Sequence, residues 1–376
     1  MPGPLDRGRP AAPAAFLGRL IRSSRAHGVT RLADVTGLDR LGLPVWQAVR
    51  PAGRSLSVHQ GKGPTDRAAR IGALCEALEA DCAERVVADG PYCRFEDLPK
   101  SERAPAIGDY CRVRSEPPPR AEKIAWCGAT DLLSGRPCWL PHDLVSLDFT
   151  RALPSRFERA SSGLGAGPAE GDALLTSLLE LVERDADGDW QRLHRDRRLA
   201  SAIVADTVPF DWFRAWESRF RSLDMILQVF ALDSIFGVSA FRCVIGGREE
   251  FGTAWRRFSG TAAHGDAEIA LFRALAEAIQ SRLTLIAGVR DDIMPSYHAR
   301  PRPGPAPGGR AEAGGRPWRE DRPRALTAES LAEELAACGY RQIAVRRLDD
   351  GLDGIAVTKA FIPGLGSSRR TRRPAR

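Results

Sequence analysis

The sequence predicts an α/β (α+β) fold in which helices and sheets bring several polar side chains together. Three stretches with helical spacing, 65–88, 170–192 and 266–287, each follow a β-rich run and a segment that contains glycine. The chain has 376 residues, 43% of them hydrophobic, which is enough for a substantial core. No repeat of fixed period occurs, which excludes a solenoid. We therefore expect one face of each long helix to turn toward a common centre.

The first half begins with a short lead and a helix. In the helix predicted over 65–88, Ile71, Leu74 and Leu78 recur at intervals of three and four residues, which places them on one buried face. The other elements expected in this half are a flexible lead over 1–13, a helix over 14–27, strands over 43–49 and 55–58, mixed strands and proline-rich loops over 98–151, and a helix over 170–192.

The second half repeats the order of strand, glycine segment and helix. We interpret the segments 61–63, 161–167 and 259–265 as glycine turns that lead into the three long helices. Proline and glycine dominate 294–323, which predicts a long surface loop or a disordered insertion. The remaining expected elements are strands over 224–232 and 236–245, a helix over 266–287, a helix over 327–338 capped by Thr327, and strands over 343–347 and 354–362.

Charge and residue patterns exclude several classes of protein. The net charge is +7, but 299–324 and 368–376 contribute +4 and +5, so the body is nearly neutral. The basic tail lacks interleaved aromatic residues, so no specific nucleic-acid partner is expected. The eight cysteines form no CxxC pair, the histidines lack metal-ligand spacing, and Ser161 and Ser162 lie outside a GxSxG frame. No apolar run approaches the roughly 18 residues that span a membrane, and a cytoplasmic protein with reduced thiols is expected.

Each long helix carries two polar side chains three residues apart. Residues at i and i+3 share one helix face, so each pair offers two neighbouring oxygen-bearing groups, which we call an acidic claw. A single such pair is common on a solvated helix face, so convergence of the three is what would make a site. The claws are Glu76/Glu79, Glu180/Glu183 and Glu277/Gln280.

The second claw is the hardest to explain as a solvated surface. Glu180 and Glu183 lie among Leu178, Leu181 and Val182, which favour a core. Two carboxylates about 4 Å apart repel by roughly 4 kcal/mol at an effective dielectric constant of about 20. A bound cation removes this repulsion, and Mg²⁺ commonly binds a few carboxylates together with substrate phosphates.

Basic residues near the claws indicate phosphate binding. Arg184 follows Glu183 directly, and Arg282 lies two residues after Gln280. Lys62 can reach a phosphate as a mobile point charge or can simply be exposed. Glycine-rich turns attract anions through their N–H groups, but these segments match neither the Walker A nor the GxGxxG spacing. Phosphate binding and plain tight turns both remain open for the glycines.

Taken in order, these motifs resemble those of the YcaO family. The resemblance covers roughly residues 28–292, and the stretches 30–39 and 362–365 are similar to the subgroup associated with TfuA proteins. The motifs are Gly61-Lys62-Gly63 with Glu76-Ala-Leu-Glu79, Ser161-Ser162-Gly163-Leu164-Gly165-Ala166-Gly167 with Glu180-Leu-Val-Glu183-Arg184, and Glu277-Ala-Ile-Gln280-Ser281-Arg282.

The resemblance implies a YcaO-like fold built around a nucleotide site, and an enzyme that uses ATP and Mg²⁺ to modify peptide backbone amides. In this family a nucleophile adds to an amide carbonyl, ATP phosphorylates the resulting oxygen, and phosphate leaves. A neighbouring Cys, Ser or Thr gives an azoline ring, whereas sulfide gives a thioamide. The implied metal ligands are Glu76, Glu79, Glu180, Glu183 and Glu277, and the implied nucleotide site adds Lys62, Arg184, Gln280 and Arg282. No covalent role is assigned to any residue, since positioning dominates phosphoryl transfer.

The resemblance also divides the chain and suggests its partners. The implied segments are a lead and helix over 1–27, an ATP-binding catalytic domain over 28–293, a loop rich in proline, glycine and arginine over 294–324, the C-terminal part of the domain over 325–365, and a basic tail over 366–376. The expected partners are a precursor peptide or protein substrate, a TfuA-like protein and a second copy of the chain.

Two departures from the family pattern leave alternatives open. The family often has serine where this chain has Gly72, and asparagine where it has Ser162, so the chain is either an active enzyme or an impaired scaffold that binds a peptide or partner. The azoline-forming members often end in PxPxP, whereas this sequence ends in Arg372-Arg373-Pro374-Ala375-Arg376. We therefore expect thioamide formation in the biosynthesis of ribosomal peptide products, with cyclodehydration as the alternative.

Overall fold

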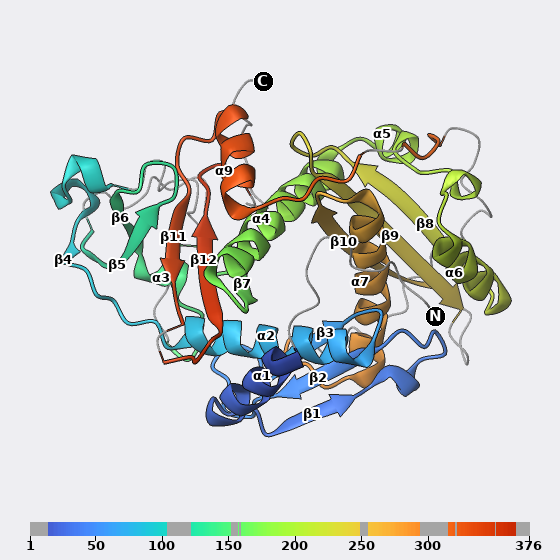
Figure 1. Ribbon diagram of the computed structural model, residues 1–376, viewed down its shortest axis with the longest axis horizontal. Coiled ribbons are helices and arrows are strands. Elements are labelled where there is room, and N and C mark those ends of the chain that lie inside the picture. Colours follow the sequence, from blue (N-terminus) through green and yellow to red (C-terminus); the bar gives the residue numbers. More distant parts are fainter. Residues whose placement is uncertain are drawn as a thin grey trace.

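Three antiparallel sheets and three long helices form the body of the protein (Figure 1). The structure is a computed structural model, and it describes residues 14–103, 122–151, 157, 159–248, 255–293, 315–319, 322–349 and 351–365. The predicted α/β class is confirmed. The predicted lead, most of the loop over 294–323 and the basic tail lie outside the described residues. In the described part of the chain, no helix is both long and apolar enough to cross a bilayer.

The first sheet has the order β1-β2-β3 and supports the helix of the first claw. Helix α2 packs on β3 and β2, and α1 packs on α2. Thr65 caps α2 by accepting a hydrogen bond from the N–H of Ala68. The elements are α1 (Ala14–Ala26), β1 (Arg31–Asp34), β2 (Val45–Val49), β3 (Val58–Lys62) and α2 (Asp66–Glu84).

The second sheet joins residues far apart in the sequence. Its order is β4-β5-β11-β12-β7, with β6 paired to β5, so the two C-terminal strands lie between β5 and β7. Helix α4 packs on β7 and β12, and α9 packs on α4. The elements are β4 (Tyr92–Cys93), β5 (Ile124–Asp131), β6 (Pro137–Pro141), α3 (His142–Val145), β7 (Leu164–Gly167), α4 (Glu170–Arg192), α9 (Ala328–Ala337), β11 (Ala344–Arg347) and β12 (Ala356–Phe361).

The third sheet has the order β10-β9-β8 and carries the third claw helix, which packs on β9 and β10. Helix α6 was not predicted, although Trp212, Phe213, Trp216 and Phe220 have helical spacing and are buried in it. The elements are α5 (Arg195–Ala200), α6 (Asp211–Ser222), β8 (Met225–Leu232), β9 (Ser239–Arg248), β10 (Trp255–His264) and α7 (Ala267–Ala287).

The predicted glycine turns are largely strands, which corrects the sequence interpretation. Gly61 lies in β3, Gly165 in β7 and Gly260 in β10. A Cβ atom at Gly61 would lie 2.0 Å from the Ala69 carbonyl oxygen of α2, and one at Gly165 would lie 2.3 Å from the Ala173 carbonyl oxygen of α4. At Gly260 it would lie 2.2 Å from the backbone nitrogen of Ala278 in α7. In all three units, glycine therefore lets a strand contact the backbone of the following helix.

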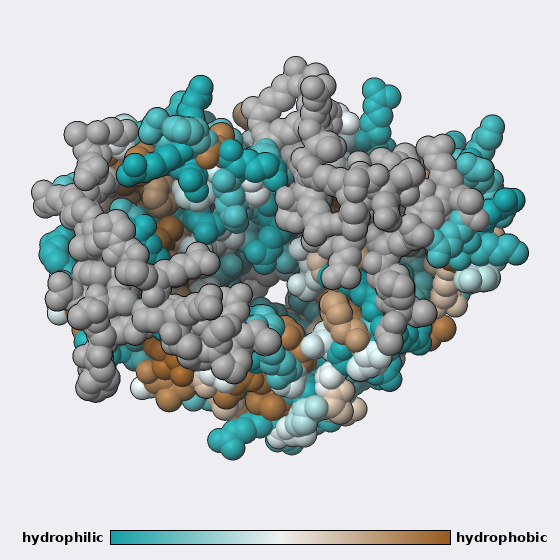
Figure 2. Space-filling model, turned by 180° about the vertical axis from the view of Figure 1, so that it is seen from behind, coloured by the Kyte–Doolittle hydropathy of each residue, from teal (hydrophilic) through white to brown (hydrophobic). Residues whose placement is uncertain are grey.

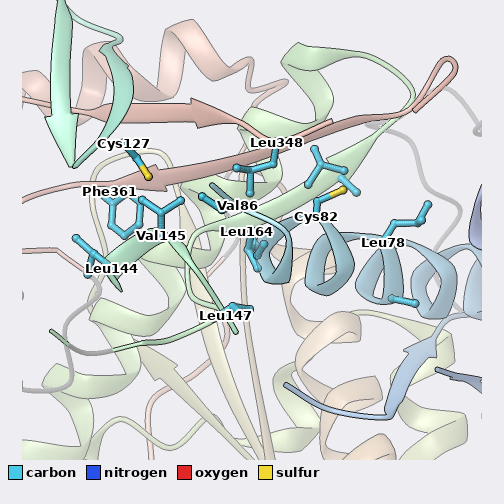
Figure 3. Packing of buried hydrophobic residues seen from close by; sticks show 14 of the residues in the cluster. Leu78, Cys82, Val86, Cys127, Leu144, Val145, Leu147, Leu164, Leu348 and Phe361 are labelled. Atoms are coloured by element: carbon cyan, nitrogen blue, oxygen red, sulfur yellow. The ribbon is translucent and has the colours of Figure 1, made fainter. Parts of the chain in front are cut away.

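The buried apolar residues that the structure describes form three clusters, each of which spans more than one sheet. One cluster contains Leu78 and Cys82 of α2, Leu164 of β7 and Phe361 of β12 (Figure 3). This packing joins the first claw helix to the second sheet. Helix α2 is therefore joined by apolar contacts to the sheet on which α4 packs.

Candidate functional site

The three claw helices surround the middle of the molecule (Figure 1), and their carboxylates act on one another electrostatically. Burial is the main cause that raises the pKa of Glu79, and Glu76 and Glu180 raise it further. Glu277 raises the pKa of Glu76, Glu180 and Glu183, although burial is the larger cause for each. Mutual repulsion of this kind acts over short separations, so the five glutamates of the three predicted claws lie near one another in the structure.

Backbone and hydroxyl groups from the strands fix the claw carboxylates. The Gln60 N–H of β3 donates to Glu76 at 3.0 Å, and the Gly163 N–H, just before β7, donates to Glu180 at 3.2 Å. The Thr261 hydroxyl of β10 donates to Glu183 at 2.7 Å. Gln60 and Thr261 were not predicted, because no motif marks a strand residue that contacts a helix 16 or 78 positions away.

Two of the predicted cations lie among the claws. Lys62 of β3 pairs with Glu277 of α7 at 3.1 Å, which links the first sheet to the third claw. Arg184 lies 3.4 Å from Glu180 and 3.9 Å from Glu183, and its side chain is 42% exposed. These two cations offset only part of the negative charge, and Arg184 remains accessible to an anionic ligand.

The pKa values of several claw carboxylates remain raised despite these cations. Burial raises the pKa of Glu79 to about 8 and that of Glu183 to about 8. Glu76 is accessible to solvent, and its pKa is also raised, with desolvation as the largest cause and Glu277 adding to it. Figure 2 views the molecule from behind and shows a hollow near its middle, with hydrophilic residues around it. A site that raises carboxylate pKa values in this way is suited to a cationic ligand.

The third claw supplies a buried amide. Gln280 is 8% exposed, and its Oε1 has no hydrogen-bond partner among the residues that the structure describes. Arg282 lies off the claw face, since its Nε donates to Asp39 at 2.9 Å. The structure therefore shows Gln280 as a buried amide one turn after Glu277 on α7, and places Arg282 against the segment that follows β1.

The donor set fits Mg²⁺. Carboxylate and amide oxygens are hard ligands, and the Oε1 of Gln280, which shares a helix face with Glu277, has no hydrogen-bond partner among the described residues. Within the described ranges, no three acidic, histidine or cysteine side chains form a preformed cage for a metal ion. Mg²⁺ rarely uses such a cage, because it keeps waters and shares its coordination with substrate phosphates. Pairs of carboxylates on separate helices match this preference.

Gly72 and Ser162, the two departures from the family motif, have different surroundings. A Cβ atom at Gly72 would lie 3.3 Å from the Gly61 Cα, so α2 and β3 are in close contact there. Ser162 is half-buried and directly precedes Gly163, which has a φ of +82°. Gly72 thus takes part in the helix–strand contact, whereas Ser162 borders the turn that holds Glu180.

Comparison with models of protein families identifies the family to which this chain belongs. The family model described as YcaO cyclodehydratase, ATP- and Mg²⁺-binding, matches residues 60–366. The chain belongs to the YcaO family. This match contains all three claws and the two C-terminal strands of the second sheet.

Similarity to curated relatives and to solved structures covers nearly the whole chain. A Rhizobium leguminosarum bv. trifolii protein from the tfuA 3′ region is 33% identical over 95% of this chain and 88% of its own length. A Methanothermobacter thermautotrophicus protein is 28% identical, with 90% of each chain covered. The structure of YcaO from Methanopyrus kandleri bound with AMPPCP and Mg²⁺ has a TM-score of 0.69 at 22% identity, covering 93% of this chain and 90% of that one. A heterocyclase in complex with substrate and cofactor also has a TM-score of 0.69, at 20% identity over 93% of this chain and 52% of that one.

Proposed function

We propose that this YcaO protein uses ATP and Mg²⁺ to phosphorylate the oxygen of a peptide backbone amide. The observation that carries the proposal is the convergence of three claws: carboxylates of the first two have raised pKa values, and the charge of Glu277 in the third contributes to that increase. Such a site stabilises a divalent cation and the phosphates attached to it. The Methanopyrus kandleri structure, with AMPPCP and Mg²⁺, supports the same choice of ligands.

Each group has a role in the proposed reaction. Glu76, Glu79, Glu180, Glu183 and Glu277 would hold Mg²⁺, which supplies charge neutralisation to the transferred phosphoryl group. Arg184 is accessible and would contact phosphate oxygens. Lys62 would exchange its contact with Glu277 for a phosphate oxygen, since Glu277 would become a ligand of Mg²⁺. Gln280 would orient the bound nucleotide, and the family motif alone suggests a phosphate contact for Arg282.

Among the possible nucleophiles, we propose sulfide and hence a thioamide product. Sulfide adds to the amide carbon, the former carbonyl oxygen receives the γ-phosphoryl group of ATP, and phosphate leaves as the thioamide forms. The relative from the tfuA 3′ region supports this choice and suggests a TfuA-like partner. The substrate would be a precursor peptide in the cytoplasm. Attack by a neighbouring side chain, which would give an azoline ring, is the alternative within the same chemistry.

Ligand binding tests the proposal. Mg²⁺-ATP should raise the melting temperature of the purified protein by several degrees, because a ligand at about 100 times its Kd stabilises the folded state by about 2.7 kcal/mol. Glu183→Gln should abolish this shift. Glu170→Gln, an exposed position on the same helix, should retain it. Absence of a shift in the wild-type protein at millimolar ATP would instead favour a non-catalytic scaffold, which Gly72 and Ser162 leave as the second candidate.

Product analysis separates the reactions. A candidate precursor peptide co-expressed with the protein should exchange one oxygen for one sulfur, as detected by accurate mass. Loss of one water would identify ring formation instead. An unmodified peptide in the presence of demonstrated Mg²⁺-ATP binding would contradict the proposed substrate.

A further inference from the structure

One lysine is buried in the second sheet without a charged partner. Lys359 of β12 is fully buried, and its Nζ donates to the carbonyl oxygens of Ala160 at 2.8 Å, Leu144 at 3.3 Å and Val145 at 3.3 Å. In the ranges that the structure describes, no carboxylate lies within 4.0 Å of this ammonium group. All three of its N–H donors are thus directed at neutral backbone carbonyls.

Burial of this ammonium group is expected to lower the stability of the fold. The surroundings are apolar: the Phe361 ring centroid lies 5.4 Å from Nζ, and Leu144 and Val145 belong to the same core cluster (Figure 3). Burial of a charge without a counter-ion is costly, and an apolar side chain of similar volume often stabilises such a position. Burial lowers the pKa of Lys359 to about 7, and the charge of Glu180 opposes that decrease. The ammonium group is therefore within electrostatic reach of the second claw.

A short chain of contacts connects Lys359 to Glu180. The Ala160 carbonyl, which accepts a hydrogen bond from Lys359, belongs to the first residue of the turn over 160–163. At the last residue of this turn, the Gly163 carbonyl accepts a hydrogen bond from the Ala360 N–H at 2.9 Å. Two consecutive residues of β12 therefore hold the two ends of this turn. At its end, the Gly163 N–H donates to Glu180. The turn lies directly against β12, because a Cβ atom at Gly163 would lie 2.3 Å from the Ala360 carbonyl oxygen.

We propose that Lys359 is a positioning residue that holds the turn over 160–163, and through Gly163 the carboxylate of Glu180, in the orientation that binds Mg²⁺ with ATP. The inference rests on the proposed function. It assigns the buried charge a task that a methionine of similar length cannot perform, because only the ammonium group can bind three carbonyls at once.

The test compares Mg²⁺ dependence in Lys359→Met and wild-type protein. ATP binding is measured by calorimetry over a series of Mg²⁺ concentrations. We expect Lys359→Met to raise the Mg²⁺ concentration at half-saturation about tenfold, as is common when a group supporting a metal ligand is lost. Binding should recover at high Mg²⁺, because the claw carboxylates themselves are intact.

A matched control separates positioning from stability. Leu348→Ala truncates a buried residue of the same cluster, away from the turn, and should lower the melting temperature without moving the Mg²⁺ midpoint. Lys359→Gln, which keeps a donor group, replaces the Met variant if the latter does not fold. Wild-type binding combined with an unchanged midpoint in the lysine variant would overturn this inference alone. Failure of the wild type to bind Mg²⁺-ATP would overturn the proposed function and this inference together.

Discussion

At the residue scale, the protein keeps carboxylates where neighbouring charge and burial disfavour their ionised form. Glu183 is 14% exposed, and burial together with Glu277 raises its pKa to about 8. Its Thr261 and Arg184 contacts work in the opposite direction but do not compensate. The free energy of unfolding is therefore reduced so that the site attracts a cation, a trade between stability and function.

The pH dependence of stability should reveal this stress. An acid whose pKa is raised in the folded state binds its proton more tightly there than in the unfolded chain, so the free energy of unfolding falls as pH rises from about 4.5 toward 8. Glu183→Gln resembles the protonated acid. We expect wild type and variant to be similarly stable at about pH 5, and the variant to be more stable by about 1–2 kcal/mol at about pH 8.5.

Urea unfolding at the two pH values, without ligands, measures this difference. Glu170→Gln serves as the control, because Glu170 is exposed and should show no gain at high pH. A difference between Glu183→Gln and wild type that stays constant with pH would show that Glu183 is ionised without penalty.

At the element scale, the recurring unit is a strand whose glycine contacts the following helix. Gly61, Gly165 and Gly260 occupy equivalent contacts in three otherwise different sheets. Each contact lets the claw helix lie against its strand, so that strand groups such as the Gln60 N–H and the Thr261 hydroxyl reach claw carboxylates. The glycines thus serve the site indirectly, through helix position.

Substitution of these glycines should be selective. We expect Gly61→Ala to destabilise the protein by at least about 2 kcal/mol, because its Cβ would overlap the backbone of α2 at Ala69 and Ala73. Gly171→Ala, at an open position in the first turn of α4, should instead be neutral or stabilising by up to about 1 kcal/mol. Thermal and urea unfolding of both variants measure the contrast. Equal stability of Gly61→Ala and wild type would contradict the helix–strand contact.

Gly72 offers a second substitution at the same contact. Its Cβ would be tight but not prohibitive against Gly61, so Gly72→Ser should fold with a loss of about 1 kcal/mol or less. The hydroxyl would lie one turn before Glu76 on the claw face, and we expect tighter Mg²⁺-ATP binding by calorimetry. Weaker binding in a folded variant would show that glycine is preferred here.

At the scale of the whole molecule, the site exists only because three sheets meet. Lys62 of the first sheet pairs with Glu277 on the helix of the third, and α2 packs on β7 of the second. A ligand shared by the three claws should therefore restrain all three units together. We expect Mg²⁺-ATP to slow amide hydrogen exchange in α2, α4 and α7 simultaneously.

The hairpin of β5 and β6 provides an internal control for that experiment. It lies at the other end of the second sheet from β7, so its exchange should not change. Protection confined to one claw helix would contradict a shared site.

The sequence by itself determined the three claw helices, the claws and the family. Helical spacing predicted α4 with its observed bounds, Thr65 and Thr327 act as caps, and the i, i+3 spacing placed each pair on one face. These are local properties, since capping and side-chain direction depend on residues within one or two turns. The order of the three motifs, together with the local chemistry, was sufficient for the YcaO assignment.

Only the tertiary structure decided what the glycines, Arg282 and Lys359 do. In a sequence, glycine typically indicates a turn. Here its role is to allow contact with the backbone of a helix that follows later in the chain. Arg282 follows the third claw in sequence, yet it pairs with Asp39, 243 residues away. Lys359 carries no motif, and its burial against the Glu180 turn depends on β12 entering the sheet beside β7. Local spacing fixes which face a residue occupies, whereas long-range packing fixes what that face meets.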